Sequence, residues 1–302
     1  MFTLFLVSVQ AEVNTGNDAL INIRPLVTFV FDDGYETDYT VAKDIFKAQG
    51  EPACAAITTG WVNTKNFLNI SQISELQKDG WEILSHTVSH PKLKTLTEDR
   101  IETELSQSKS TLESWGFKVN NLVYPYNWNN ETVKNIVRKY YRSGRNGHKM
   151  LNSSDLDKYD LKSYSNEIST RHKMSAIKSQ IDQVYSEKKW LIFQHHRIDA
   201  KVKISNKNGI FIFEERLSFQ PSGAVGQYIK DIWSIVQFIP LSGNPQAGDT
   251  VTGQSGGASG KLDSVIYNEG AALTEMIEYI HKNYPDMRIV TIDKGLDLMG
   301  LP

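Results

Sequence analysis

The sequence has a single cysteine, almost no net charge and no long hydrophobic run. With Cys54 alone, neither a disulfide framework within the chain nor a cysteine-rich zinc site can form. A formal net charge of −2 creates no global field that would attract nucleic acid or an anionic membrane surface. Because no apolar run approaches the ~20 residues needed to span a bilayer, the sequence predicts a globular protein without a membrane span or a nucleic-acid partner.

The length and composition are ordinary for a globular protein, and only the N-terminus stands apart. The chain of 302 residues is long enough for one large domain or two modest ones. Residues 1–13, "MFTLFLVSVQAEV", have an apolar core and a small residue near the end, as in a signal peptide, but no lysine or arginine precedes the core. A β-strand or a non-native remnant is the alternative. We therefore treat residues 1–25 as an N-terminal extension.

Between residues 26 and 196, short apolar runs alternate with longer amphipathic stretches. The runs that predict strands are "LVTFVF", "ACAAIT", "WEILS", "NLVYP" and "KWLIFQ". The stretches that predict helices lie near residues 37–49, 70–79, 97–115, 129–140 and 173–187. Strands alternating with helices of this length predict an α/β fold around a parallel sheet. The order of strand, motif and helix fits a barrel with its reactive groups at the carboxyl ends of the strands.

After residue 200 the character of the sequence changes. Residues 203–267 are rich in glycine, serine and threonine, with β-branched and aromatic runs between turns, which predicts several antiparallel strands. "EGAALTEMIEYIHKNY" then predicts a helix again, and "MRIVTID" a strand. We therefore expect an α/β domain of residues 26–202 and 268–302, interrupted by a β-rich insert of residues 203–267. The run "SGNPQAGDTVTGQSGGASGKLDS" within it could instead form a mobile loop.

Two adjacent aspartates, Asp32 and Asp33, stand between the first predicted strand and Gly34. Successive side chains of a strand point to opposite faces, but at a strand end that enters a turn both can reach one pocket. A divalent cation bound to one carboxylate would offset the repulsion between them. The alternative is a turn-forming "DDG" without a metal.

The motif "SHTVSHP" places His86 and His90 four residues apart, after the predicted strand "WEIL". This spacing would put two imidazoles on one side of a helical turn, where both can bind one metal ion. Surface or capping histidines are the alternative. Two histidines and one aspartate form a sensible ligand set for a hydrolytic metal ion that must keep positions open for water and substrate.

His195 and His196 end the apolar run of "WLIFQHHRID". Adjacent residues of a strand face opposite ways, so we expect only one of the two to enter a site. The ordinary pKa of histidine suits acid–base chemistry near neutral pH. A histidine pair at a strand end without a catalytic role is the alternative.

A fourth motif, "LVYPYNWNN", predicts a rigid aromatic loop that contains Tyr126 and Trp128. Sugar rings stack on such surfaces, and a backbone N–H beside a proline can bind an oxyanion. A loop whose aromatic side chains only pack against the protein is the alternative.

Together these motifs resemble the polysaccharide deacetylase family, also called the NodB-like domain or carbohydrate esterase family four. "TFVFDDG" is followed some fifty residues later by "HTVSHP", then by a "PY" loop and by a histidine after an apolar strand. The likeness covers about residues 26–200 and returns at "EMIEYIHKNYPDMRIVTID". It implies a distorted (β/α) barrel with a β-rich insertion near the C-terminus. It also implies a hydrolase of non-peptide carbon–nitrogen amide bonds that removes acetyl groups from a carbohydrate.

The resemblance also implies roles for individual residues. Asp33, His86 and His90 would bind the metal, usually Zn²⁺, with Co²⁺ or Ni²⁺ as alternatives. Asp32 would be the general base that activates water, and the backbone N–H of Tyr126 would help to bind the oxyanion.

The histidine of the last motif would be the general acid that protonates the leaving amine. His196, in "HRI", fits the family pattern better than His195. The aromatic loop adds Tyr126 and Trp128 as residues that would contact the sugar. Arg145 joins them because it matches a recurrent arginine in the subset of the family with "YPY".

The sequence departs from the family pattern at two places. Val123 occupies the position where many members carry an arginine that orients the catalytic aspartate, and "YYRSGRNG" could supply an arginine instead. The β-rich insert is not part of the common domain. Its "GDTVTGQSGGASG" resembles small β-modules of phage tail and virion proteins, which suggests a viral or prophage origin and a secreted or virion-associated protein.

Three functions remain open from the sequence. The first is N-deacetylation of an amino-sugar polymer such as chitin oligosaccharide or peptidoglycan. The second is O-acetyl esterase activity on xylan or a capsular polysaccharide. The third is an inactive glycan-binding virion module in which the insert binds the polymer. Because each catalytic motif is filled, the sequence favours an enzyme.

Overall fold

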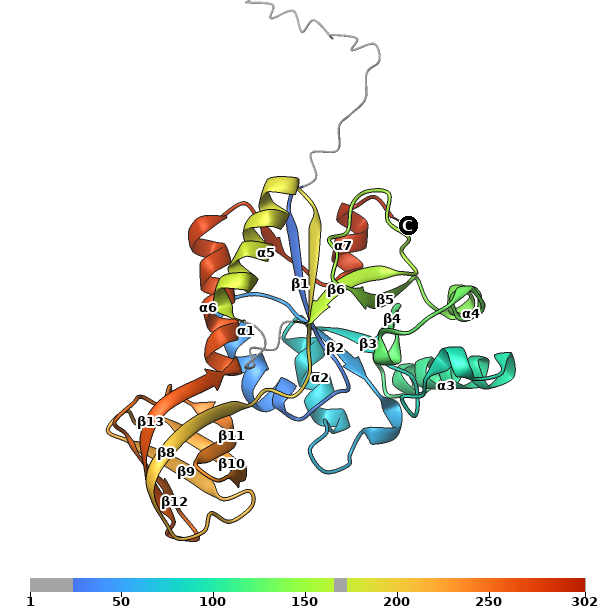
Figure 1. Ribbon diagram of the computed structural model, residues 1–302. Coiled ribbons are helices and arrows are strands. Elements are labelled where there is room, and N and C mark those ends of the chain that lie inside the picture. The colour runs from blue at the N-terminus through green and yellow to red at the C-terminus, as the bar shows by residue number, and fades with distance from the viewer. Residues whose placement is uncertain (1–23, 166–172, 302) are drawn as a thin grey trace, which may run out of the picture.

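The computed structural model describes residues 24–165 and 173–301, and these fold into two closed barrels (Figure 1). The expected N-terminal extension lies almost entirely outside the described residues. None of the helices in the described ranges combines the length and the apolar character that crossing a membrane requires.

The first barrel is built from parallel strands, so the predicted α/β barrel is confirmed. Its strands are β1 (Leu26–Phe31), β2 (Cys54–Ile57), β3 (Glu82–Ser85), β4 (Asn121–Val123), β5 (Ser143–His148), β6 (Leu161–Ser165) and β7 (Trp190–His195). Each pairs with the next, and β1 closes the barrel by pairing with β7 along its whole length. On its other edge β1 pairs first with the short β14 (Arg288–Ile289) and then, at its carboxyl end, with β2.

Helices surround this barrel in nearly the predicted places (Figure 1). They are η1 (Asp38–Ala42), α1 (Lys43–Gln49), α2 (Ile70–Lys78), α3 (Glu98–Ser114), α4 (Glu131–Tyr140), α5 (Met174–Glu187) and α6 (Glu269–Asn283). Local chemistry sets their starts: the Asn69 side chain caps α2 in a reciprocal box with Gln72, and Asn130 caps α4. Thr97, which precedes α3, makes no capping hydrogen bond.

Alternating residues of each strand face different cores. On β1, Phe29 and Phe31 face outward and pack against the helices, for example against Phe46 of α1. Leu26 and Val30 face the interior of the barrel. The same alternation holds on β7, where both faces are also buried. Because side chains alternate between the two faces of a strand, the position of a residue along the strand determines which way its side chain points, also just beyond the strand end.

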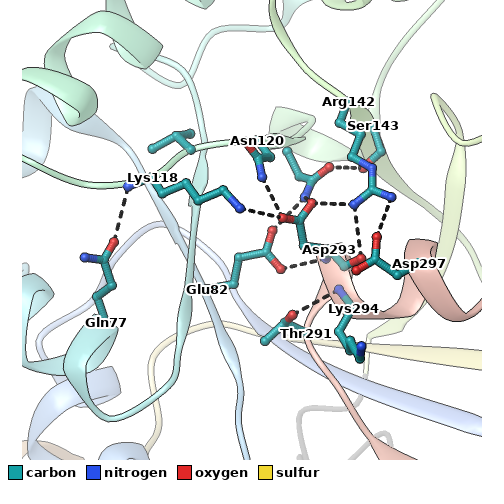
Figure 2. Close-up of polar contacts among 12 residues, drawn as sticks. Gln77, Glu82, Lys118, Asn120, Arg142, Ser143, Thr291, Asp293, Lys294 and Asp297 are labelled. Carbon is teal, nitrogen blue, oxygen red and sulfur yellow. Dashed lines mark hydrogen bonds and ion pairs between the residues drawn. The ribbon is translucent and has the colours of Figure 1, made fainter. Parts of the chain in front are cut away.

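The short helix α7 (Ile292–Leu298) closes the end of the barrel where the parallel strands begin. Its apolar residues Ile292 and Leu296 join the interior core beside Trp190. Figure 2 shows the polar network around it. Glu82, at the start of β3, accepts hydrogen bonds from Asn121 Nδ2 at 2.6 Å and from Asp293 N at 2.8 Å. This end is therefore sealed, and the opposite end carries the loops after the strands.

The second barrel is antiparallel and closed. Its strands are β8 (Ala200–Asn208), β9 (Arg216–Gln220), β10 (Val225–Ile232), β11 (Ile235–Ser242), β12 (Thr250–Gly253) and β13 (Ser259–Asn268). They follow the order β10-β11-β8-β13-β12-β9 around a core of their own, which includes Val202, Phe219 and Phe238. The mobile-loop alternative for residues 242–264 is wrong, because β12 and the first half of β13 lie there and are paired.

Candidate active site

The candidate residues gather where the parallel strands end. Asp32 and Asp33 follow β1, His86 follows β3, Tyr126 follows β4 and His196 follows β7. Because the carboxyl ends of parallel strands meet at one end of a barrel, residues far apart in sequence come together there.

Asp33, His86 and His90 form a cluster whose geometry fits a metal ion. One ligand atom from each residue lies within 4.8 Å of the other two. Asp33 Oδ1 is 3.4 Å from His86 Nε2 and 3.3 Å from His90 Nε2. This oxygen is buried and has no hydrogen-bond partner among the described residues, which is costly for a carboxylate. A divalent cation between the three atoms would satisfy it, and the set would leave open positions for water and substrate.

The protonation states of this cluster suit metal binding. Burial raises the pKa of Asp33, but contact with His86 and the charges of the neighbouring histidines outweigh it, so the pKa lies below its usual value. Burial and the nearby His86 lower the pKa of His90 to about 4, so this imidazole is neutral at pH 7. His86 Nδ1 lies 2.8 Å from the carbonyl oxygen of Val123. That contact assigns the ring proton to Nδ1 and leaves Nε2 free to bind a metal.

The loop from His86 to His90 is irregular, so the prediction of a helical turn there is wrong. Thr87 and His90 have φ angles of 68° and 57°, and these left-handed residues bring the two rings to a centroid distance of 4.8 Å. Glu104 of α3 holds the loop. Its carboxylate accepts hydrogen bonds from the backbone N–H groups of Val88 and Ser89, both at 2.9 Å, and from the Ser89 hydroxyl at 2.6 Å.

Asp32 lies beside the metal cluster and is held by Arg145. Both side chains are buried, and Arg145 Nη2 donates to both carboxylate oxygens, with Oδ2 at 2.5 Å. Arg145 Nη1 donates to Asn127 Oδ1 at 2.6 Å. The expectation that Arg145 contacts the sugar does not fit this arrangement, because its guanidinium is only 1% exposed and faces Asp32. Arg145 is therefore positioned to orient the carboxylate of Asp32.

The two histidines after β7 face different ways, as the period of two requires. His195 continues the outward face of β7, and its ring stacks near Phe31 and Phe29 with centroid distances of 5.2 and 5.9 Å. His196 is close enough to Asp33 and His90 for its charge to affect the pKa of both. The structure therefore places His196, and not His195, beside the metal cluster.

The aromatic loop after β4 borders the cluster on the solvent side. The ring of Tyr126 is 50% exposed and lies 4.6 Å from that of His90. The ring of Trp128 is 39% exposed, with Lys94 Nζ 4.0 Å from its centroid. Tyr126 has a φ angle of 59°, and its N–H makes no hydrogen bond within the described residues. This leaves one backbone donor available near the cluster.

Two residues of the site were not expected from the sequence. Glu104 lies on the buried face of α3 beside Ile101 and Leu105, and an acid at such a position is the signal that could have revealed it. Asn127 accepts from Arg145 and donates to Gln194 Oε1 at 3.0 Å. Its place directly after "PY" gives no hint of this link.

Comparison with known proteins agrees with the geometry. Residues 22–142 match the family model for polysaccharide deacetylases. YxkH of Bacillus subtilis, provisionally named a polysaccharide deacetylase, is 28% identical over 137 residues, which are 45% of this chain and 49% of that protein. The poly-β-1,6-N-acetyl-D-glucosamine N-deacetylase of Staphylococcus aureus is 33% identical over 125 residues, 36% of this chain and 43% of that protein. The chain thus spans about half the length of these curated relatives.

Solved structures share the fold at low sequence identity. The Xyl-CE4 domain of a multidomain xylanase from the hindgut metagenome of Trinervitermes trinervoides is 15% identical, with a TM-score of 0.51 over 92% of each chain. The T48 deacetylase with substrate is 13% identical, with a TM-score of 0.50 over 93% of this chain and 94% of that one. These two show the fold alone. Residues 22–142 belong to the polysaccharide deacetylase family by their match to its model, and the cluster at the strand ends agrees with this.

Proposed function

We propose that the protein is a metal-dependent deacetylase that hydrolyses N-acetyl groups of an amino-sugar polymer of the chitin or peptidoglycan type. The observation that carries this proposal is the cluster of Asp33, His86 and His90 next to an aspartate held by a buried arginine. The name of the Staphylococcus aureus relative, an N-deacetylase of poly-N-acetylglucosamine, supports the amide as the bond that is cleaved.

Asp33, His86 and His90 would hold the metal, and Zn²⁺ suits one carboxylate and two imidazoles well. When bound, such an ion supplies a Lewis acid for the acetyl carbonyl and makes a water molecule more acidic. Asp32 lies one residue from a metal ligand and would take the proton of the attacking water. Arg145 fixes the direction of its carboxylate, which keeps the base oriented for that transfer.

The other two roles fall to the loops after β4 and β7. The N–H of Tyr126 is available to donate to the oxyanion that forms when water attacks the carbonyl. His196 would give a proton to the departing nitrogen, which must leave as an amine. Each group therefore has one step: Asp32 removes a proton, Tyr126 stabilises charge and His196 returns a proton.

Acetate release tests the proposal. Purified protein, stripped with chelator and reloaded with Zn²⁺, is incubated with N-acetylglucosamine oligomers, peptidoglycan and acetylated xylan. We expect acetate from at least one of the amino-sugar polymers, only in the metal-loaded sample. Acetate from xylan alone would favour an O-acetyl esterase instead, and no acetate from any substrate would overturn the enzyme assignment. His281, on α6 and paired with Glu51, provides a control in H281Q, which should keep full activity where H90Q loses it.

A further inference from the structure

His196 borders a cleft of about 510 Å³ whose walls come from both barrels. On the side of the parallel barrel it is lined by Tyr35 and by the segment that follows His196. The antiparallel barrel supplies Lys201, Gln237 and Tyr267. The volume lies within the ~300–1,000 Å³ that is usual for small-molecule sites. The insert therefore forms part of the wall next to the proposed general acid.

A buried hydrogen-bond network fixes this wall in place. Asp199, three residues after His196, is 8% exposed. Its carboxylate accepts from the hydroxyl of Tyr267 on β13 at 2.7 Å and from Gln237 on β11. Its N–H donates to Glu269 Oε2 at 2.8 Å, at the start of α6. The position of the antiparallel barrel is thus tied to the segment that carries His196.

The charges of the cleft are mixed. Arg197 and Lys201 are cationic, while Asp199 and Glu269 are anionic. Arg197 Nη2 lies 3.7 Å from Asp199 Oδ2, and Lys201 Nζ lies 5.3 Å from the centroid of the Tyr267 ring. Donors and acceptors side by side suit hydroxyl groups, which both donate and accept. The lining carries two cations and two carboxylates, so an uncharged sugar ring with hydroxyl groups fits it without an excess of either charge.

We propose that this cleft binds an uncharged sugar unit adjacent to the one that loses its acetyl group. The antiparallel barrel is then a substrate-recognition part of the active site, and the enzyme distinguishes a polymer from a single acetylated sugar. This inference rests on the proposed deacetylase function. Lys201 offers the simplest test, because it lines the cleft from β8 of the antiparallel barrel and makes no hydrogen bond in the buried network around Asp199.

The variant K201M removes the ammonium and keeps most of the side-chain stem. We expect about tenfold lower kcat/KM on an N-acetylglucosamine pentamer, the size of effect of one lost hydrogen bond from a charged group. Hydrolysis of 4-nitrophenyl acetate, which contains no sugar to occupy the cleft, should be unchanged. Lys203 lies two residues further on β8, is exposed and does not line the cleft, so K203M is the matched control and should stay within twofold of the wild type.

A binding measurement separates this inference from the proposed activity. Calorimetry with the pentamer compares D32N, which is expected to bind without turnover, with D32N/K201M and D32N/K203M. Binding that is about tenfold weaker in D32N/K201M and unchanged in D32N/K203M supports a sugar-binding site in the cleft. This holds even if no polymer releases acetate and the proposed function fails. Equal effects of K201M and K203M would overturn the inference, and so would no effect of K201M or no binding of the pentamer to D32N.

Discussion

Replacing Arg145 with methionine should destabilise the parallel barrel strongly, because it leaves the carboxylate of Asp32 buried without a cation. Asp32 is 2% exposed and Arg145 1% exposed, so water cannot replace the lost partner. Removing one member of a buried ion pair costs roughly 3–5 kcal/mol. The variant also loses the 2.6 Å hydrogen bond to Asn127, so we expect the loss of unfolding free energy in R145M to lie near the upper end of this range. A loss of that size should lower the melting temperature by on the order of 10 °C.

A double-mutant cycle isolates the pair. D32N and R145M each leave one buried group without its charged partner, whereas D32N/R145M leaves no charge unpaired. The double variant should therefore be more stable than R145M alone, by roughly 2 kcal/mol or more. Urea unfolding of the four proteins in chelator, followed by tryptophan fluorescence, gives each free energy of unfolding from its midpoint and slope. If the losses simply add, with the double variant the least stable of the four, the reasoning is refuted.

Three further predictions concern the metal cluster and the closed end of the barrel. H90Q should weaken Zn²⁺ binding by more than ~100-fold, measured by competition with a chromophoric chelator, while H281Q should not. E104Q should weaken Zn²⁺ binding about tenfold, because it loosens the loop that carries His90. E102Q, at a half-buried position of the same helix where the carboxylate contacts Lys139 and not this loop, should leave the affinity unchanged. Burial raises the pKa of Glu82 to about 7, so the folded protein keeps a proton that the unfolded chain loses above pH ~4.5, and stability should fall as pH rises from ~4.5 to 7. The contribution is up to about 3 kcal/mol, and E82Q should remove it from urea unfolding curves measured at pH 5 and pH 8.

Strongly patterned elements could be predicted from the sequence, and polar strands could not. The helices from η1 to α6 and the strands β1, β2, β3, β4 and β7 appear where apolar periodicity placed them, whereas α7 begins inside the expected strand "MRIVTID". The strands β5 and β6 were missed, because "SGRNGH" and "LKSYS" lack an apolar run. Two polar side chains of β5 have specific partners: Arg145 holds Asp32 at the site, and Asn146 donates to Asp160 at 2.7 Å. The polar residues that these contacts require remove the apolar pattern by which a strand is predicted.

The candidate site was predictable in its members but less so in its geometry. The motifs predicted the residues of the metal cluster. The spacing of His86 and His90 suggested a helical turn, but in the structure left-handed residues of an irregular loop bring the two rings together. The choice between His195 and His196 could not be made from the run "WLIFQ", because both faces of a strand in this barrel are apolar. The observed partners, phenylalanines for His195 and the cluster around Asp33 for His196, favour His196 as the residue of the site.

The place of the insert in the chain explains how a second barrel can join an active site without disturbing the first. The antiparallel barrel begins at Ala200, five residues after the end of β7, and ends at Asn268, directly before α6. These two residues are paired across β8 and β13. The chain therefore leaves and re-enters the parallel barrel at almost the same point, and the strand pairing of the first barrel is unchanged. The antiparallel barrel has its own core, so it needs no support from the α/β core. The entry segment, however, carries His196 and Asp199. Because residues of the inserted barrel line the same cleft as His196, we expect them to affect substrate recognition as well as folding.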